Sequence, residues 1–251
     1  MIAGIQVSSF KPLLTTDQQV QTAFEKMSEM GCRYVQLQWI DPSVSVEHIA
    51  KCLKLTGIHS VSVQDFYEVI RQNPDYYIQL NATTGGKWMC VSRIPDRLKT
   101  RQGLDDYIDE LRAMQNQLDA YGQRLCFHAV AADFAPVEGV APVEYLLESM
   151  PELAVCADLY HVHKVGLDLN EWLRRWSGRV CMVHFKDAVH ADGQEQLVPA
   201  GQGEVDWTGV VDTCLETGVE YAFAEQERWN RNAFECLQEA FDWIVRQGGE
   251  Q

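Results

Sequence analysis

The sequence predicts a single α/β domain, residues 1–251, folded as a (β/α)₈ TIM barrel. The chain has 251 residues, and this barrel typically uses about 250 residues as one undivided unit. Short apolar runs of β type alternate with amphipathic helical stretches, and the cycle returns at intervals of about thirty residues. No low-complexity segment and no linker rich in Pro, Gly or Ser divides the chain. These three observations favour one large core.

Eight apolar runs are the predicted strands, and helical patterns lie between them. The strands are expected at residues 2–7, 34–40, 59–63, 88–94, 125–130, 153–159, 180–185 and 221–224. The clearest helical patterns cover residues 17–30, 104–121, 169–176 and 207–217. Several end at Gly31, Gly122, Gly178 or Gly218, and glycine best tolerates the left-handed cap position.

The alternation of strands and helices predicts parallel strands joined by right-handed crossovers. Eight such units close into a barrel more naturally than they form an open, doubly wound sheet, which is the alternative fold. Ser8-Ser9-Phe10-Lys11 follows the first strand, where a dinucleotide-binding sheet would carry Gly-x-Gly-x-x-Gly. In a barrel the functional residues belong at the C-terminal ends of the strands.

The composition excludes several functional classes. Hydrophobic residues make up 46% of the chain and charged residues 23%, which are ordinary globular values. Lys and Arg total 21 against 36 Asp and Glu, and the net charge of −15 disfavours nucleic acid and anionic membranes as partners. The eight cysteines occur singly, as expected of buried free thiols. The opening residues MIAGIQVSSF lack the features of a signal peptide, so we expect a cytoplasmic protein.

Polar residues stand at the ends of three consecutive predicted strands. Asp158 ends the sixth strand, His184 the seventh and Glu225 the eighth. A lone Asp there is usually a helix N-cap and a lone His a packed residue, but three in succession favour a shared site. Carboxylates and an imidazole form a mixed oxygen and nitrogen site that suits Mn²⁺, Mg²⁺, Co²⁺ or Zn²⁺.

Three segments of the chain resemble a known family. Residues 158–187, with VPAGQGEVDW at 198–207 and AFAEQER at 222–228, resemble the xylose isomerase-like barrels of the sugar phosphate isomerase/epimerase type. The resemblance is strong over residues 153–228 and weak before residue 120. It implies that Asp158, His184 and Glu225 bind a divalent metal.

The fourth metal ligand is left open between two residues. The family commonly has a Glu after the fifth strand, whereas this chain has Phe127-His128-Ala129-Val130-Ala131-Ala132-Asp133. His128 occupies the strand end, and Asp133 falls where a later Glu would lie. We favour His128 because its imidazole would leave the strand directly, and with neither residue the metal would keep three protein ligands and water.

The same strand ends offer candidate catalytic residues. A divalent ion would stabilise the charge on an enediolate formed from a carbonyl and a neighbouring hydroxyl. Glu225 or Glu227 could remove and return the proton. Lys186 could orient a substrate oxygen, or alternatively form an ion pair with Asp187 or Glu227.

Four residues are predicted to contact the substrate. His161 is the candidate nearest to Asp158, and His161 and His163 would share one face if that segment is extended. Trp39, Gln64 and Arg228 lie at or just beyond other strand ends. Trp39 could instead be ordinary packing.

The predicted activity is that of a metal-dependent isomerase or epimerase acting on a keto-sugar or an inositol-like polyol through an enediolate. A dehydratase or lyase acting on a keto-sugar, keto-glycoside or inosose is the main alternative. A non-catalytic sugar-binding barrel with a decayed metal site is another, and the negative charge disfavours an abasic-site endonuclease. We expect a small sugar or polyol as the partner, unphosphorylated because few cations occupy the strand ends, with a homo-oligomer as one possibility.

Overall fold

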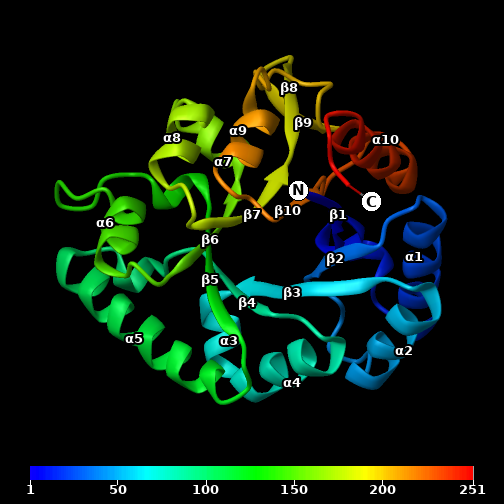
Figure 1. Cartoon of the computed structure of the whole chain (residues 1–251), viewed down its shortest axis with the longest axis horizontal. Coiled ribbons are helices and arrows are strands. Elements are labelled where there is room, and N and C mark those ends of the chain that lie inside the picture. Colours follow the sequence, from blue (N-terminus) through cyan, green and yellow to red (C-terminus); the bar gives the residue numbers. More distant parts are fainter. Residues whose placement is uncertain (251) are drawn as a thin grey trace.

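The computed structural model describes residues 1–250, which form a closed barrel of eight parallel strands in a single domain. Figure 1 shows the helices arranged around the outside of the strands. The order around the barrel is β1-β10-β7-β6-β5-β4-β3-β2. The strands are β1 (Ile2–Gln6), β2 (Tyr34–Leu37), β3 (His59–Phe66), β4 (Trp88–Ser92), β5 (Arg124–Ala129), β6 (Ala154–Asp158), β7 (Val180–Phe185) and β10 (Tyr221–Ala224). The predicted fold class and all eight strands are confirmed.

The connections between the strands are mostly helical. The α-helices are α1 (Asp17–Glu29), α2 (Val46–Thr56), α3 (Tyr67–Gln72), α4 (Pro74–Thr84), α5 (Arg101–Asp119), α6 (Pro142–Ser149), α7 (Leu159–Lys164), α8 (Leu169–Arg175), α9 (Val210–Glu216) and α10 (Ala233–Arg246). Three short 3₁₀ helices are η1 (Val7–Leu13), η2 (Asp96–Leu98) and η3 (Ala131–Asp133). The four glycines predicted as helix ends all have positive φ, so the cap positions were predicted correctly.

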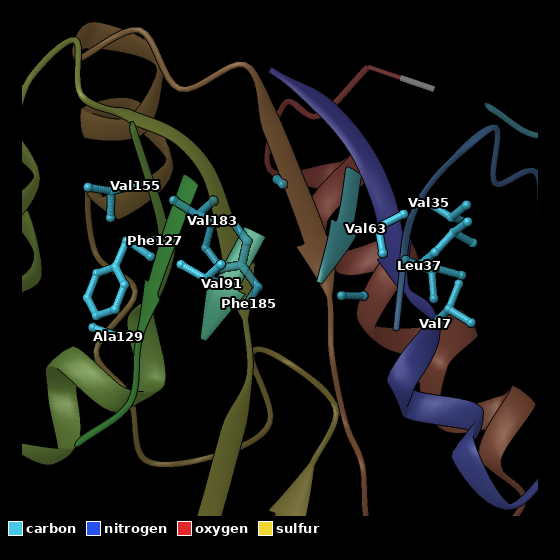
Figure 2. Packing of buried hydrophobic residues seen from close by; sticks show 14 of the residues in the cluster. Val7, Val35, Leu37, Val63, Val91, Phe127, Ala129, Val155, Val183 and Phe185 are labelled. Atoms are coloured by element: carbon cyan, nitrogen blue, oxygen red, sulfur yellow. The ribbon is translucent and has the colours of Figure 1, made fainter. Parts of the chain in front are cut away.

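The core has two parts, one under the helices and one inside the barrel. Figure 2 shows outward-facing strand residues such as Val35, Leu37 and Val63 within the main buried cluster. The second cluster fills the barrel interior and includes Cys90 and Phe223. All eight cysteines are buried and free, as predicted. Within residues 1–250, no helix is long and apolar enough to cross a membrane.

Two local features differ from the sequence predictions. An antiparallel hairpin of β8 (Asp187–Ala191) and β9 (Gln194–Val198) follows β7 and was not predicted. Its turn is Asp192-Gly193, both at positive φ, as a tight hairpin requires. The segment after Asp158, considered above in an extended form, is helical, because the Asp158 carboxylate accepts a hydrogen bond from the backbone N–H of His161 (3.0 Å) and starts α7. His161 and His163 therefore do not share one face.

The loop after the hairpin is fastened to the end of β7 by the buried carboxylate of Asp187. Its oxygens accept hydrogen bonds from the backbone N–H groups of Gly201 (3.1 Å), Gly203 (3.0 Å) and Val205 (3.2 Å), and from the indole N–H of Trp207 (2.9 Å). A Cβ atom on Gly203 would lie 2.0 Å from Asp187 Oδ1. The glycines of residues 201–207 thus allow the backbone to approach this carboxylate closely.

Replacing Asp187 with alanine is expected to lower the free energy of unfolding by about 3 kcal/mol or more, because several buried donors lose their common acceptor. Urea unfolding measures the change. Asp206→Ala is the matched control in the same loop, since this exposed carboxylate accepts one hydrogen bond, from the Thr208 N–H at 3.0 Å. Equal losses in the two variants would contradict the role given to Asp187.

Candidate metal centre and active site

Three potential metal ligands meet at the C-terminal end of the barrel. Asp158 ends β6, while His128 and His184 each lie one residue before the end of their strands, β5 and β7, and the three strands are adjacent. Each offers one ligand atom, and these atoms all lie within 4.8 Å of one another. Strand register accounts for part of this convergence, because Asp158 is the direct partner of His184. All three side chains are buried.

Glu225 approaches the same point from the loop after β10. Its Oε2 atom lies 3.0 Å from Nδ1 of His184, while Oε1 accepts a hydrogen bond from the Ser8 hydroxyl at 3.2 Å. The side chain is buried. The structure thus brings together Asp158, His184, Glu225 and His128, four of the five residues predicted as metal ligands.

Each of these four side chains has one buried polar atom without a hydrogen-bond partner within residues 1–250. The atoms are His128 Nε2, Asp158 Oδ2, His184 Nδ1 and Glu225 Oε2, which we call the four-donor set. An unsatisfied buried polar atom costs about 1–3 kcal/mol, so four such atoms on neighbouring side chains need an explanation. Two imidazole nitrogens and two carboxylate oxygens are suitable ligands for a divalent cation, and the residues present therefore fit one.

The other polar atoms of the same side chains are held in place. Nε2 of His184 lies 2.6 Å from Oε1 of Gln36, which also accepts a hydrogen bond from Nε2 of Gln6 at 2.8 Å. Because an amide oxygen can only accept, Nε2 of His184 carries a proton and donates it here. Nδ1 of His128 lies 2.9 Å from the Ser92 hydroxyl. These contacts orient the ligand atoms, as outer partners do in metal sites.

The sequence analysis missed Gln6, Gln36, Ser8 and Ser92 as positioning residues. Gln36 and Ser92 are polar residues inside otherwise apolar strand sequences, and both are buried. Buried polar residues in such positions usually have a specific partner. This was the available signal, although it does not identify the partner.

The two carboxylates dominate the electrostatics of the cluster. Burial raises the pKa of the Glu225 carboxyl, but Lys186 and His184 lower it further, and the net pKa lies well below its usual range. Burial and the neighbouring His184 lower the pKa of His128 to about 3, so its imidazole is neutral, as a ligand requires. Burial lowers the pKa of His184, but Glu225 and Asp158 outweigh it and raise the pKa. The two carboxylates therefore attract positive charge to this point.

Lys186 and Glu227 form a partly buried ion pair beside the four-donor set. Nζ of Lys186 lies 2.6 Å from Oε1 of Glu227 and 3.7 Å from Oδ2 of Asp158. Burial lowers the pKa of Lys186, but Glu225, Asp158 and Glu227 raise it more, so it remains an ammonium. Burial and Glu225 raise the pKa of Glu227, whose Oε2 has no hydrogen-bond partner among the described residues. Of the two ion pairs considered for Lys186, the structure contains the one with Glu227.

Asp133 lies outside the four-donor set. Its two oxygens accept hydrogen bonds from the backbone N–H groups of Ile94 (3.2 Å) and Val130 (3.1 Å), and Lys99 Nζ lies 3.3 Å away. This carboxylate joins the loop after β5 to the loop after β4. Of the two residues considered for the fourth ligand, His128 is therefore the one with a free atom at the site.

The predicted substrate-contacting residues have different positions. His161 lies at the site, with Nε2 3.6 Å from Asp158 Oδ2. Arg228 instead pairs with Glu195 of the hairpin at 2.8 Å. Trp39 and Gln64 line a cavity of about 280 Å³ at the ends of β2 and β3.

Glu195 attaches the hairpin to the segments on both sides of the site. Its carboxylate accepts hydrogen bonds from the Tyr160 hydroxyl (2.9 Å), from the Arg228 guanidinium (2.8 Å) and from the Lys164 ammonium. Tyr160 and Lys164 belong to α7, which starts at Asp158, and Arg228 follows Glu225. The hairpin is therefore connected to two of the loops that carry the four-donor set.

The contribution of Glu195 to stability is expected to fall at acidic pH. The Lys164 ammonium lowers the pKa of this carboxyl, burial opposes that, and Tyr160 lowers it further, to about 2. Because the folded pKa lies below the ordinary 4.5, the stabilisation is complete above pH 4.5 and is lost as the pH falls toward 2. The difference in unfolding free energy between the wild type and Glu195→Gln, measured in urea, should shrink over that range. A difference that grows with acidity would contradict the assignment.

Comparisons with known proteins agree with this architecture. The family model for the xylose isomerase-like TIM barrel matches residues 18–247. A sugar phosphate isomerase/epimerase from Parabacteroides distasonis has a TM-score of 0.81 at 17% identity, over 98% of this chain and 97% of that one. An L-ribulose 3-epimerase has a TM-score of 0.76 at 13% identity, over 98% and 94% of the two chains. The IolI protein with a zinc atom has a TM-score of 0.76 at 16% identity, over 98% of both chains.

The comparison with curated proteins finds no match. At these identities the solved structures establish the fold alone, whereas the family model covers most of the sequence. The family predicted from the motifs at the last three barrel strands is thereby confirmed: the chain belongs to the xylose isomerase-like TIM barrels.

Proposed function

We propose that this protein is a divalent-metal-dependent isomerase or epimerase that acts on a keto-sugar or an inositol-like polyol through an enediolate. The observation that carries the proposal is the four-donor set. His128, Asp158 and His184 each offer a ligand atom within 4.8 Å of the others, and the Glu225 carboxylate lies 3.0 Å from His184 Nδ1. Asp158, His184, Glu225 and His128 would hold the ion. When bound, a divalent cation supplies Lewis acidity that stabilises negative charge on substrate oxygens.

Glu227 is better placed than Glu225 to move the proton. Glu225 is oriented by Ser8 and faces His184, which suits a metal ligand. Glu227 has a free Oε2 atom and a raised pKa, caused by burial and by Glu225, and both properties suit a general base that must also return the proton. The carboxylate removes a proton from the carbon beside the carbonyl and delivers it to the product carbon.

Lys186 and His161 would position the substrate. The Lys186 ammonium already donates to Glu227, and its remaining protons are available to a substrate oxygen. His161 has a buried, unpartnered Nδ1 atom that could bind a hydroxyl. Because Lys186 is buried, its charge acts at low dielectric, where electrostatic interactions are strong.

Deuterium incorporation tests the activity before any product is known. The metal-loaded protein is incubated with a panel of keto-sugars and inososes in D₂O and followed by NMR. We expect exchange at the carbon next to the carbonyl, and we expect a chelator to stop it. Loss of a hydroxyl or of a glycosidic group during exchange would identify the dehydratase or lyase alternative.

The same experiment separates an enzyme from a binding protein. If the ion binds but no member of the panel exchanges deuterium, the isomerase proposal fails and the sugar-binding barrel is favoured. If no divalent ion binds and a chelator leaves the thermal stability unchanged, the metal site itself is contradicted. A cytoplasmic location and an unphosphorylated substrate remain part of the proposal.

A further inference from the structure

The cavity lined by Trp39 and Gln64 lies at the C-terminal ends of β2 and β3, on the same face of the barrel as the candidate metal centre. Its volume is about 280 Å³, and α4 contributes Tyr76, Tyr77 and Leu80 to its wall. The strand ends contribute Gln38 and Gln64, and none of the four-donor set lines it. The cavity is therefore a separate space on the same face of the barrel.

The amide pair Gln38–Gln64 links this cavity to the metal centre. Gln36 contacts His184, and Gln38 follows it two residues later on the same chain segment. Two residues of extended chain advance about 7 Å, roughly the length of one sugar ring. Gln64 of β3 donates a hydrogen bond to Oε1 of Gln38 at 3.2 Å. A ligand held at the metal centre by one ring could therefore place a second group in the cavity.

The cavity wall contains one unpartnered polar atom. Oε1 of Gln64 is buried and accepts no hydrogen bond from residues 1–250, although the amide N–H of the same side chain is bound to Gln38. The neighbouring carboxylate of Asp65 already accepts hydrogen bonds from the Tyr77 hydroxyl (2.6 Å) and the Phe66 N–H (2.7 Å). A ligand with one hydroxyl donor would satisfy Gln64, because a buried polar group without a partner is costly.

The aromatic wall is held by a strained backbone. Trp39 has φ of 59°, a region that non-glycine residues rarely adopt and that costs about 1–2 kcal/mol. Its ring lies 5.8 Å from the Phe66 ring, and Lys11 Nζ lies 4.3 Å from the ring centroid. A strained backbone conformation persists only where contacts with the surrounding structure hold it in place. Here it places an indole ring in a wall that also contains aliphatic side chains such as Leu37 and Val63.

The charges of the wall do not suit a phosphate. Of the lining residues, all within the described chain, Lys11 alone is cationic, and Asp41 and Asp65 are both carboxylates. Phosphate sites typically have an excess of guanidinium, ammonium or backbone N–H donors. An uncharged aromatic ring, in contrast, can stack on Trp39 and bury its surface against the aliphatic side chains.

We infer that this cavity binds an uncharged aromatic ring attached to the polyol, so that the substrate is a glycoside-like conjugate. The inference rests on the proposed function for the polyol end of the substrate. The ring stacks on Trp39, the linking or adjacent hydroxyl donates to Gln64 Oε1, and the polyol reaches the four-donor set past Gln38.

Calorimetric titration of the chelator-treated protein tests the cavity without the metal. The probes are phenyl β-glucoside, methyl β-glucoside and glucose 6-phosphate. Stacking and burial of the phenyl ring should make phenyl β-glucoside bind about tenfold more tightly than methyl β-glucoside. Glucose 6-phosphate should bind more weakly than phenyl β-glucoside. Undetectable binding of phenyl β-glucoside, equal affinity of the two glucosides, or tighter binding of the phosphate would each overturn the inference.

Two cavity variants and one control locate the binding. Trp39→Leu should remove the preference for the phenyl group, and Gln64→Leu should weaken both glucosides. Tyr121→Ala is the matched control, because this exposed aromatic side chain precedes β5 at the opposite end of the barrel. A phenyl preference that survives in Trp39→Leu, or unchanged affinity for both glucosides in Gln64→Leu, would overturn the inference. The folding of each variant is checked by circular dichroism.

Divalent-ion binding distinguishes failure of this inference from failure of the proposed function. Trp39→Leu and Gln64→Leu should bind Mn²⁺ with wild-type affinity, because neither residue belongs to the four-donor set. If Trp39→Leu loses the phenyl preference and still binds Mn²⁺, the cavity assignment is supported. Absent Mn²⁺ binding in the wild type would contradict the proposed function, while the phenyl preference would still test the cavity.

Discussion

Glutamine in place of Glu225 is expected to lower turnover by about a thousandfold while leaving the fold intact. The amide oxygen can still accept the hydrogen bond that the Ser8 hydroxyl donates to Glu225. The negative charge facing His184 is lost, however, and with it one of the two carboxylates of the four-donor set. The rate of deuterium exchange into an accepted keto-sugar measures the effect, and circular dichroism confirms the fold.

Glu239→Gln provides the control for this substitution. Glu239 is a partly exposed carboxylate on α10 that pairs with Arg231, so its replacement should leave the exchange rate within about twofold of the wild type. Full activity in Glu225→Gln would remove Glu225 from the site. Equal losses in the two variants would indicate a general effect of charge on the protein.

Adding a divalent ion to the chelator-treated protein is expected to raise the melting temperature by about 10 °C. An ion present at a thousand times its dissociation constant stabilises the folded state by about 4 kcal/mol. For a domain of this size each kcal/mol shifts the melting temperature by about 2–4 °C. The physical reason is that the cation gives the two carboxylates and two imidazoles of the four-donor set a common buried partner. Scanning calorimetry with Mn²⁺, Co²⁺, Zn²⁺ and Mg²⁺ measures the shift and ranks the ions.

Two alanine variants identify the ligand from β5. His128→Ala should reduce the ion-induced shift, because Nε2 of His128 belongs to the four-donor set. Asp133→Ala should lower the melting temperature with and without the ion, yet leave the ion-induced shift unchanged, because this carboxylate binds the N–H groups of Ile94 and Val130. The reverse pattern would assign the ligand to Asp133.

Periodicity was sufficient to predict the barrel, because the eight strands and the longer helices each show their hydrophobic period within about ten residues of sequence. The glycines that end the helices could be predicted for a similar reason, because each one directly follows a helical pattern in the sequence. The hairpin after β7 was missed because its two strands are short and partly exposed, so they lack the apolar run that identifies a barrel strand. The helix after Asp158 was missed because a six-residue segment depends on its cap more than on periodicity.

The convergence of the candidate metal ligands could be predicted because they come from strand ends, and adjacent parallel strands end at the same face. Their positioning partners could not, since the contact of Gln36 with His184 joins β2 to β7 across the closed barrel. The pairing of Arg228 with Glu195 depends on the hairpin, which was not predicted. The cavity beside Trp39 depends on the conformation of loops, and a positive φ at a tryptophan has no signal in the sequence.

The buried carboxylate of Asp187 separates the hairpin after β7 from the residues that form the site. Asp187 starts the hairpin, and its carboxylate accepts hydrogen bonds from Gly201 and Gly203, which follow the hairpin. Both ends of this segment are therefore fixed at one point. Lys186 directly precedes Asp187, so its position does not depend on the residues of the hairpin turn. Residues around the Asp192-Gly193 turn could be exchanged or lengthened to change what enters the site, and the reacting groups below would be left undisturbed.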